Sequence, residues 1–219
     1  MSGFVSARQK MVDGQVRTSD VTDHRIIDAM LAVPREDFVP ESKRALAYLD
    51  LDLDVSENAA VKRYLLKPQL TAKLLQAAGI AASDSILIVG CATGYVAALA
   101  ARLAAKVTAI ETDSALVARG QAALRGTQNV TLKTAELLRG DPDNAPYDAI
   151  ILNGATETTT ENLCGQLKEG GRLVGVFATT RPPRAMVVTR SHGEFGTRVL
   201  FDASAPILPG FERVPAFVF

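Results

Sequence analysis

From Ser85 onward, short apolar runs alternate with segments of helical pattern. The run Ser85–Val89 (SILIV) is continuously apolar after its first residue, as expected of a strand buried on both faces of a sheet. Further strands are predicted at 107–111, 129–133, 148–152 and 172–178, and helices near 94–105, 113–125 and 158–168. Such alternation is typical of a parallel sheet wound on both faces by helices. The predicted fold class is therefore α/β, with a mostly parallel, doubly wound sheet.

The two ends of the chain depart from this pattern. Two strand-like runs, 185–190 and 197–202, flank the turn SHGEFG and predict an antiparallel C-terminal hairpin. Before the sheet, helices are expected at 22–31, behind a Thr22 cap, and at 69–78, between Pro68 and Gly79; the alternating residues 49–55 (LDLDLDV) predict a strand. We expect an N-terminal helical cap over 1–80 and a nucleotide-binding body over 81–219, packed as one compact unit.

Composition excludes several classes of partner. Lys plus Arg and Asp plus Glu number 24 each, so no basic excess exists to neutralise the phosphates of a nucleic acid. Cys91 and Cys164 offer neither a disulfide scaffold nor the spacing of a metal site. The first ten residues lack an apolar leader, and Arg102 and Lys106 interrupt the longest Ala-rich run, so no membrane association is expected. These features predict a cytoplasmic protein; they do not indicate an oligomeric state.

A glycine-containing loop, Gly90-Cys91-Ala92-Thr93-Gly94-Tyr95, follows the first apolar strand. Loops at the carboxyl ends of parallel strands are where open α/β sheets bind ligands. The spacing is G-x-x-x-G; a dinucleotide fingerprint would need glycine at 92 and 95, which disfavours a nicotinamide dehydrogenase, and the Lys-Ser/Thr of a P-loop is absent. The loop can pass beside a nucleoside, although the spacing alone also occurs in αβ turns that bind nothing.

Acidic residues stand at the end of the next predicted strand and just after the one that follows it. Glu111 lies 21 residues after Gly90, where a carboxylate can accept hydrogen bonds from both ribose hydroxyls. Glu136 follows the third strand and could accept from an adenine amino group, or be simply solvated. Strand, loop, helix, strand and Glu in this order favour a bound nucleoside cofactor.

Several segments resemble the protein-L-isoaspartate O-methyltransferase family over residues 11 to about 180. They are the N-terminal stretch 11–41, the motif VGCATGY, the acids Glu111 and Glu136, YDAIILNGA (147–155) and LKEGGRLV (167–174). The resemblance implies a Rossmann-like class I methyltransferase that uses S-adenosylmethionine to methylate isoaspartyl carboxylates in damaged peptides and proteins, a repair activity. It also implies a cofactor site formed by Gly90, Cys91, Ala92, Thr93, Gly94, Tyr95, Glu111, Thr112, Glu136 and Asn153.

The chain departs from the family pattern at several positions. Leu66 stands where the family has a Ser or Thr that engages the substrate, Ile88 replaces an acid, and Ala92 replaces the middle glycine of the loop. Residues 60–68 lack the family's glycines, and the tail 205–219 does not match. Two alternatives therefore remain open: a methyltransferase acting on another small substrate, or a non-catalytic relative that binds the cofactor.

The chemistry implied makes few demands on side chains. A carboxylate is ionised at neutral pH, so its methylation by in-line displacement requires alignment of the reacting atoms rather than a general base. Tyr95 could stack on the methionine part of the cofactor, or pack in the core. His24 and His192 are predicted to lie at the surface, and we assign them no role.

Overall fold

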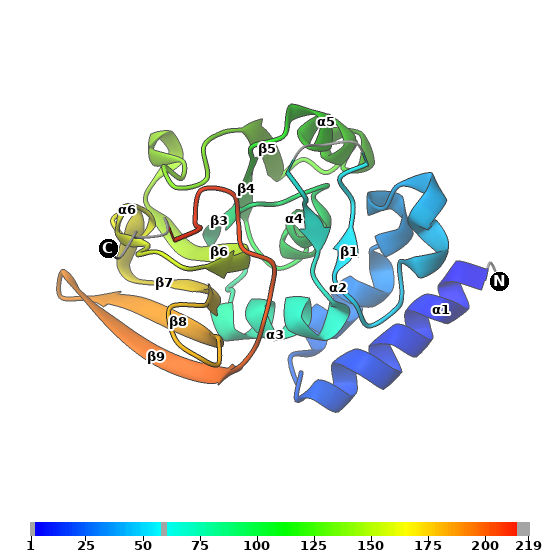
Figure 1. Ribbon diagram of the computed structural model, residues 1–219, viewed down its shortest axis with the longest axis horizontal. Coiled ribbons are helices and arrows are strands. Elements are labelled where there is room, and N and C mark those ends of the chain that lie inside the picture. Colours follow the sequence, from blue (N-terminus) through cyan, green and yellow to red (C-terminus); the bar gives the residue numbers. More distant parts are fainter. Residues whose placement is uncertain (1–2, 58–60, 214–219) are drawn as a thin grey trace, which may run out of the picture.

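A central sheet of seven strands, in the order β5-β4-β3-β6-β7-β8-β9, organises the part of the chain that the computed structural model describes, residues 3–57 and 61–213 (Figure 1). The strands are β3 (Ser85–Val89), β4 (Lys106–Glu111), β5 (Val130–Thr134), β6 (Tyr147–Thr156), β7 (Leu167–Phe177), β8 (Arg184–Ser191) and β9 (Glu194–Asp202). Strands β3 to β7 pair in parallel, whereas β7-β8 and β8-β9 pair antiparallel. The predicted fold class and the C-terminal hairpin are confirmed.

Apolar residues on successive positions of β3 face opposite sides of the sheet. Ile86 and Ile88 belong to a core cluster shared with α3 (Pro68–Ala78) and α4 (Tyr95–Ala100). Leu87 and Val89 belong to a second cluster, which includes residues of α6 (Glu161–Cys164) and of the C-terminal segment. The unbroken apolar run thus reflects burial on both faces. The remaining body helices are α5 (Ser114–Ala123) and the short η5 (Pro142–Asn144).

The N-terminal residues form a cap of short helices and one small hairpin. Its elements are α1 (Gly3–Met11), η1 (Val12–Val16), η2 (Arg17–Ser19), α2 (His24–Ala32), η3 (Arg35–Phe38), η4 (Glu41–Leu46), β1 (Leu53–Asp54) and β2 (Tyr64–Leu65). One core cluster runs from Met11 and Ile26 of this cap to Ile86 of the sheet, so cap and sheet share apolar packing. A domain boundary at residue 80 stays a prediction.

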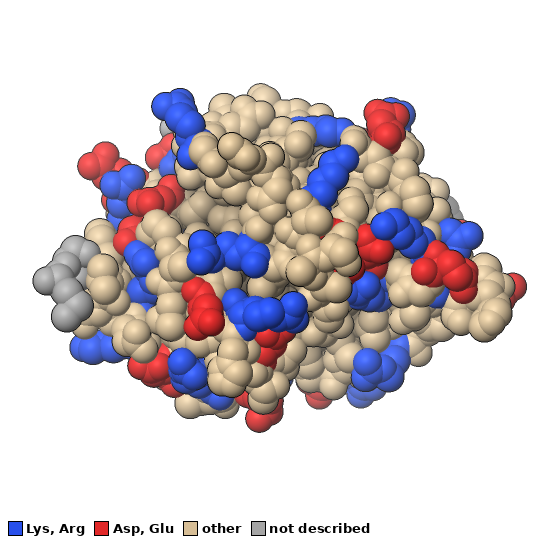
Figure 2. All heavy atoms as spheres, turned by 180° about the vertical axis from the view of Figure 1, so that it is seen from behind, with Lys and Arg blue, Asp and Glu red and all other residues tan. Residues whose placement is uncertain are grey.

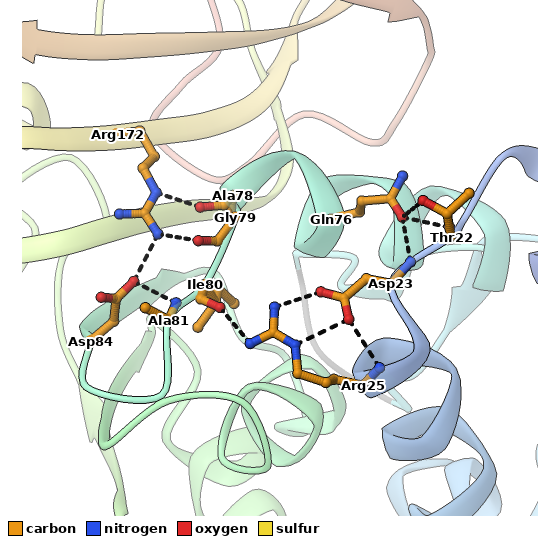
Figure 3. A network of polar contacts seen from close by, with 10 residues as sticks. All are labelled: Thr22, Asp23, Arg25, Gln76, Ala78, Gly79, Ile80, Ala81, Asp84 and Arg172. Atoms are coloured by element: carbon orange, nitrogen blue, oxygen red, sulfur yellow. Dashed lines mark hydrogen bonds and ion pairs between the residues drawn. The ribbon is translucent and has the colours of Figure 1, made fainter.

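Polar contacts tie the cap to the amino ends of the strands (Figure 3). Arg172 on β7 donates to the carbonyls of Ala78 and Gly79 and pairs with Asp84 at 2.7 Å. Arg25 on α2 pairs with Asp23 and donates to the Ile80 carbonyl at 3.0 Å. This network lies before β3, at the end of the sheet opposite the glycine loop.

Three local predictions were wrong in detail. Helix α2 begins at His24 and is capped by Asp23, not Thr22, because the Asp23 carboxylate accepts from the Arg25 amide at 2.9 Å. Of the expected strand 49–55, only Leu53–Asp54 pairs, with β2. The expected helix 158–168 is confined to Glu161–Cys164, because Leu167 already pairs with Tyr147 in the sheet.

The surface carries acidic and basic side chains intermingled rather than segregated on the face seen in Figure 2, in keeping with their equal numbers. Within the described residues, no helix combines the length and the apolar character needed to cross a bilayer.

Candidate functional site

The glycine loop leaves β3 at the point where the strand order reverses. Strand β3 lies between β4 and β6, and the crossovers on its two sides run in opposite directions, which is the usual ligand position in open α/β sheets. Gly90 (φ +76°) and Gly94 (φ +90°) adopt left-handed backbone, as does Ala92 (φ +50°). The amides of Gly90 and Cys91 both donate to the Ile110 carbonyl, at 2.9 and 3.0 Å, which fixes the loop against β4.

Glu111, the last residue of β4, turns its carboxylate toward this loop. Its side chain is fully buried. The Ala92 amide donates to Oε2 at 2.7 Å and the Thr112 amide to Oε1 at 2.8 Å. The Thr112 hydroxyl adds a third contact at 3.1 Å. The predicted loop and the predicted acid therefore meet.

Arg63, which precedes β2, occupies the space between the loop and the acid. Its Nε lies 3.1 and 3.0 Å from the two carboxylate oxygens of Glu111, and its Nη2 lies 2.9 Å from Oε2. The same Nη2 donates to the Gly90 carbonyl at 2.9 Å. Both side chains are excluded from solvent, at 2% and 0% exposure. No motif or periodicity in the sequence singles out Arg63.

Leu208, from the C-terminal segment, forms a second wall over the loop. A Cβ placed on Gly90 would lie 2.5 Å from the Leu208 side chain and 2.6 Å from the Arg63 guanidinium; one placed on Gly154 would lie 2.7 Å from Leu208. Two backbone hydrogen bonds anchor this segment to β6. The Leu208 amide donates to the Ala155 carbonyl at 2.9 Å, and the Ala155 amide donates to the Pro206 carbonyl at 2.8 Å. Glycine at 90 and 154 is what allows this close approach.

In this arrangement, the site does not fit an adenosyl group. The Glu111 carboxylate that would receive ribose hydroxyls already accepts from the backbone and from Arg63, and the volume above Gly90 holds the side chains of Arg63 and Leu208. The family-type elements are in place, but this chain's own side chains close the space between them.

The remaining loop residues are packed into the protein. Thr93 donates its hydroxyl to the Phe38 carbonyl at 2.5 Å, linking loop and cap. Tyr95 follows the core-packing alternative: its buried ring makes an edge contact with Phe38 at 5.6 Å and lies under the Arg35 guanidinium at 4.8 Å. Burial raises the pKa of the Cys91 thiol, so Cys91 is not a reactive thiolate.

Of the two remaining predicted site residues, Asn153 contacts the glycine loop, whereas Glu136 is exposed to solvent. Asn153 on β6 is buried and donates to the Gly90 carbonyl at 2.9 Å, so it braces the loop from the opposite side to Glu111. Glu136, beyond the end of β5, is exposed. Their assignment to a cofactor remains a prediction, as does that of the loop residues.

Leu66, at the family's substrate-engaging position, is buried in the core cluster that joins cap and sheet. Its carbonyl accepts from Arg35 Nη2 at 2.9 Å and from the Thr71 hydroxyl at 3.3 Å. The side chain at this position therefore contributes apolar packing and no hydrogen bond.

The acidic residues of the stretch 49–55 serve separate local contacts. Asp54 pairs with Lys62 at 3.2 Å and Lys43 at 3.4 Å, and also accepts from Ser56. Asp52 accepts from the Lys67 amide at 2.8 Å. These acids do not share one strand face, because only Leu53 and Asp54 of the stretch are in a strand.

Comparisons with known proteins agree on one family. The family described as protein-L-isoaspartate(D-aspartate) O-methyltransferase matches residues 6–200. The protein-L-isoaspartate O-methyltransferase of Koribacter versatilis is 36% identical over 204 residues, covering 92% of this chain and 90% of that one. That of Roseiflexus sp. is 36% identical over 173 residues, covering 78% and 77%.

Solved structures agree on the fold. A protein-L-isoaspartate O-methyltransferase structure matches with a TM-score of 0.82 at 23% identity, over 93% of this chain and 66% of that chain. A Plasmodium falciparum structure assigned to the same enzymes, in complex with S-adenosyl-L-homocysteine, matches with a TM-score of 0.76 at 16% identity, over 95% and 99%. At these identities, the likeness supports the fold class alone.

Proposed function

Because the chain belongs to the protein-L-isoaspartate(D-aspartate) O-methyltransferase family, we propose that it methylates the free carboxylate of isoaspartyl residues in damaged peptides and proteins. Enzymes of this family take the methyl group from S-adenosylmethionine. The substrate carboxylate is already ionised at neutral pH, so the protein's task is to exclude water and hold the acceptor in line.

The observation that supports the proposal most is the meeting of the loop Gly90–Tyr95 with the Glu111 carboxylate at the switch point of the sheet. We propose these residues, with Thr112, Glu136 and Asn153, as the cofactor site. The partner class follows from the family. A cytoplasmic location and independence from nucleic acid remain predictions from the sequence.

A smaller or more apolar acceptor is the second candidate, and Leu66 is the observation that favours it. A hydroxyl at this position could hydrogen-bond to a substrate, whereas the buried leucine cannot. Under this alternative the enzyme transfers methyl groups, but to another small substrate and not to an isoaspartyl peptide.

The test is transfer of radiolabelled methyl from S-adenosylmethionine to an isoaspartyl peptide, with the matched aspartyl peptide as control. We expect base-labile label in the isoaspartyl peptide only. The absence of label at high enzyme concentration, with label entering small molecules of a lysate, would support the second candidate. Label in neither would leave a cofactor-binding relative without catalysis.

The substitution Leu66→Ser tests whether the missing hydroxyl at position 66 limits the methylation of isoaspartyl peptides. We expect increased isoaspartyl methylation, because the variant restores a hydroxyl at the position of the family's Ser or Thr. Leu66→Ala is the matched control, since it removes the same apolar bulk without supplying a hydroxyl; both variants should lose about 2–4 kcal/mol of stability from the cavity. Equal rates in the two variants would show that the hydroxyl is not what this site lacks.

A further inference from the structure

Arg63 lies where the proposed function requires a ribose. The Glu111 carboxylate accepts hydrogen bonds from four donor atoms, which are the Ala92 and Thr112 amides, the Thr112 hydroxyl and Nε of Arg63, and Nη2 of Arg63 adds an ion pair at 2.9 Å. A carboxylate offers about four lone-pair sites, so none is free for a sugar hydroxyl. The two amides belong to the backbone, so only the side chains of Arg63 and Thr112 can leave without unfolding the loop, and of these two only Arg63 carries a charge.

We propose that Arg63 is an internal competitor that sets this chain's affinity for its adenosine-containing cofactor: the guanidinium holds the ribose position on Glu111, and binding requires its displacement. This inference rests on the proposed function, because it concerns the same site. It adds a residue that controls occupancy and that the family resemblance did not assign.

The backbone of the β1-β2 hairpin holds Arg63 in this position. The Arg63 amide donates to the Ser56 hydroxyl at 3.0 Å, and its carbonyl accepts from the Val55 amide at 2.9 Å. The side chain is thus directed from the hairpin into the sheet, where both it and Glu111 are buried. The competitor is presented by a cap element and not by the sheet itself.

Charge explains why Arg63 competes effectively. Its contacts with Glu111 join opposite full charges, whereas ribose hydroxyls are neutral donors that leave the charge of the buried carboxylate unpaired, and an unpaired buried charge is costly. The exchange also requires the guanidinium to find new partners or return to water. Only molecules in which Arg63 has left Glu111 can bind the cofactor. The apparent affinity is therefore the intrinsic affinity multiplied by the fraction of molecules in that open state.

Leu208 adds an apolar closure above the same glycine. Its side chain is buried, and it meets the space over both Gly90 and Gly154. This leucine comes from the C-terminal segment, beyond residue 200 where the family match ends, so the closure is built from two regions that are distant in the sequence. Movement of Arg63 alone frees Glu111; movement of Leu208 is needed to free the volume above the loop.

The test is calorimetric titration of S-adenosyl-L-homocysteine, up to millimolar concentration, into the wild type and into Arg63→Ala. We expect at least about tenfold tighter binding by the variant, since the open state no longer competes with the guanidinium. The matched control is Arg172→Ala, which removes another ion-paired arginine from the opposite end of the sheet (Figure 3) and should leave the affinity unchanged.

Each outcome bears on the proposal. Equal affinities in Arg63→Ala and the wild type overturn it, while isoaspartyl methylation by the same preparations leaves the proposed function standing. Tighter binding without methylation supports the competitor and refutes the function. If no variant binds the nucleoside, both fail.

A milder variant covers loss of folding in Arg63→Ala. Arg63→Lys keeps a positive charge opposite Glu111, but its ammonium group lacks the planar guanidinium that contacts the carboxylate and the Gly90 carbonyl together. We therefore expect this variant to bind S-adenosyl-L-homocysteine at least about three times more tightly than the wild type does. An affinity equal to that of the wild type in this variant also overturns the proposal.

Discussion

At the scale of single residues, Gly90 carries two demands at once. It adopts φ +76°, and the space where a Cβ would stand holds Arg63 and Leu208 within 2.6 Å. Gly79, which ends α3, has φ +56° but no atom within 4 Å of the same position. A substitution at Gly79 therefore tests backbone strain alone, whereas a substitution at Gly90 adds a steric clash to the same kind of strain.

We expect Gly79→Ala to cost about 1–2 kcal/mol from the left-handed backbone alone. Gly90→Ala should cost about 1–3 kcal/mol more, because two buried side chains have to move. Urea unfolding of both variants measures the difference. Equal losses of unfolding free energy in the two variants would mean that the side chains of Arg63 and Leu208 do not fill the space beside Gly90.

Residues also differ in how far the sequence could reveal them. Glu111 was predictable, because it ends an apolar strand a fixed distance after the loop, and both elements are local in sequence. Arg63 was not, since it lies 48 residues from its partner and follows no periodic pattern. Leu208 was missed for the same reason: a packing contact between distant segments leaves no local trace.

At the scale of elements, the apolar strands were predicted well because burial on both faces leaves an unambiguous run of residues. The alternating stretch 49–55 was misleading: a strand needs a partner, and only β2 supplies one, for two residues. Similarly, 158–168 has helical spacing, but pairing of Leu167 with β6 recruits its end into the sheet. Tertiary pairing overrides local pattern in both cases.

The β1-β2 hairpin that presents Arg63 depends on Asp54. Burial alone would raise the pKa of Asp54, but hydrogen bonds from Ser56 and the nearby Lys62 and Lys43 outweigh it and lower the pKa to about 2. A folded-state pKa below the unfolded value of about 3.9 contributes stability above pH 4 that is lost as the pH falls toward 2.

Asp54→Asn should therefore be less stable than the wild type at pH 5 to 7, with the difference shrinking as the pH falls from about 4 to 2. Unfolding by urea across this range measures it. Asp50→Asn is the matched control, because Asp50 is exposed and its contact is a 3.4 Å hydrogen bond from Gln69. If the difference in unfolding free energy between Asp54→Asn and the wild type persisted unchanged at pH 2, the contacts of the Asp54 carboxylate with Ser56, Lys62 and Lys43 would not be its cause.

At the scale of the whole molecule, the family and fold implied by the resemblance are confirmed, and the closure of the site is the new element. Three regions distant in sequence meet there: the hairpin of the cap, the loop after β3 and the C-terminal segment. Figure 1 shows the cap and the C-terminal segment reaching the sheet from different sides. Opening the site therefore has to loosen contacts in two of these regions together.

Hydrogen exchange on the wild type, with and without saturating S-adenosyl-L-homocysteine, should detect this coupling. We expect faster exchange at the Arg63, Val55 and Leu208 amides, whose partners are Ser56, the Arg63 carbonyl and the Ala155 carbonyl. The Ala105 amide, bonded to Asp84 at the other end of the sheet, should not change. Slower exchange at all of the first three amides would instead indicate a preformed site that tightens on its ligand, because displaced segments cannot gain protection from contacts they have left.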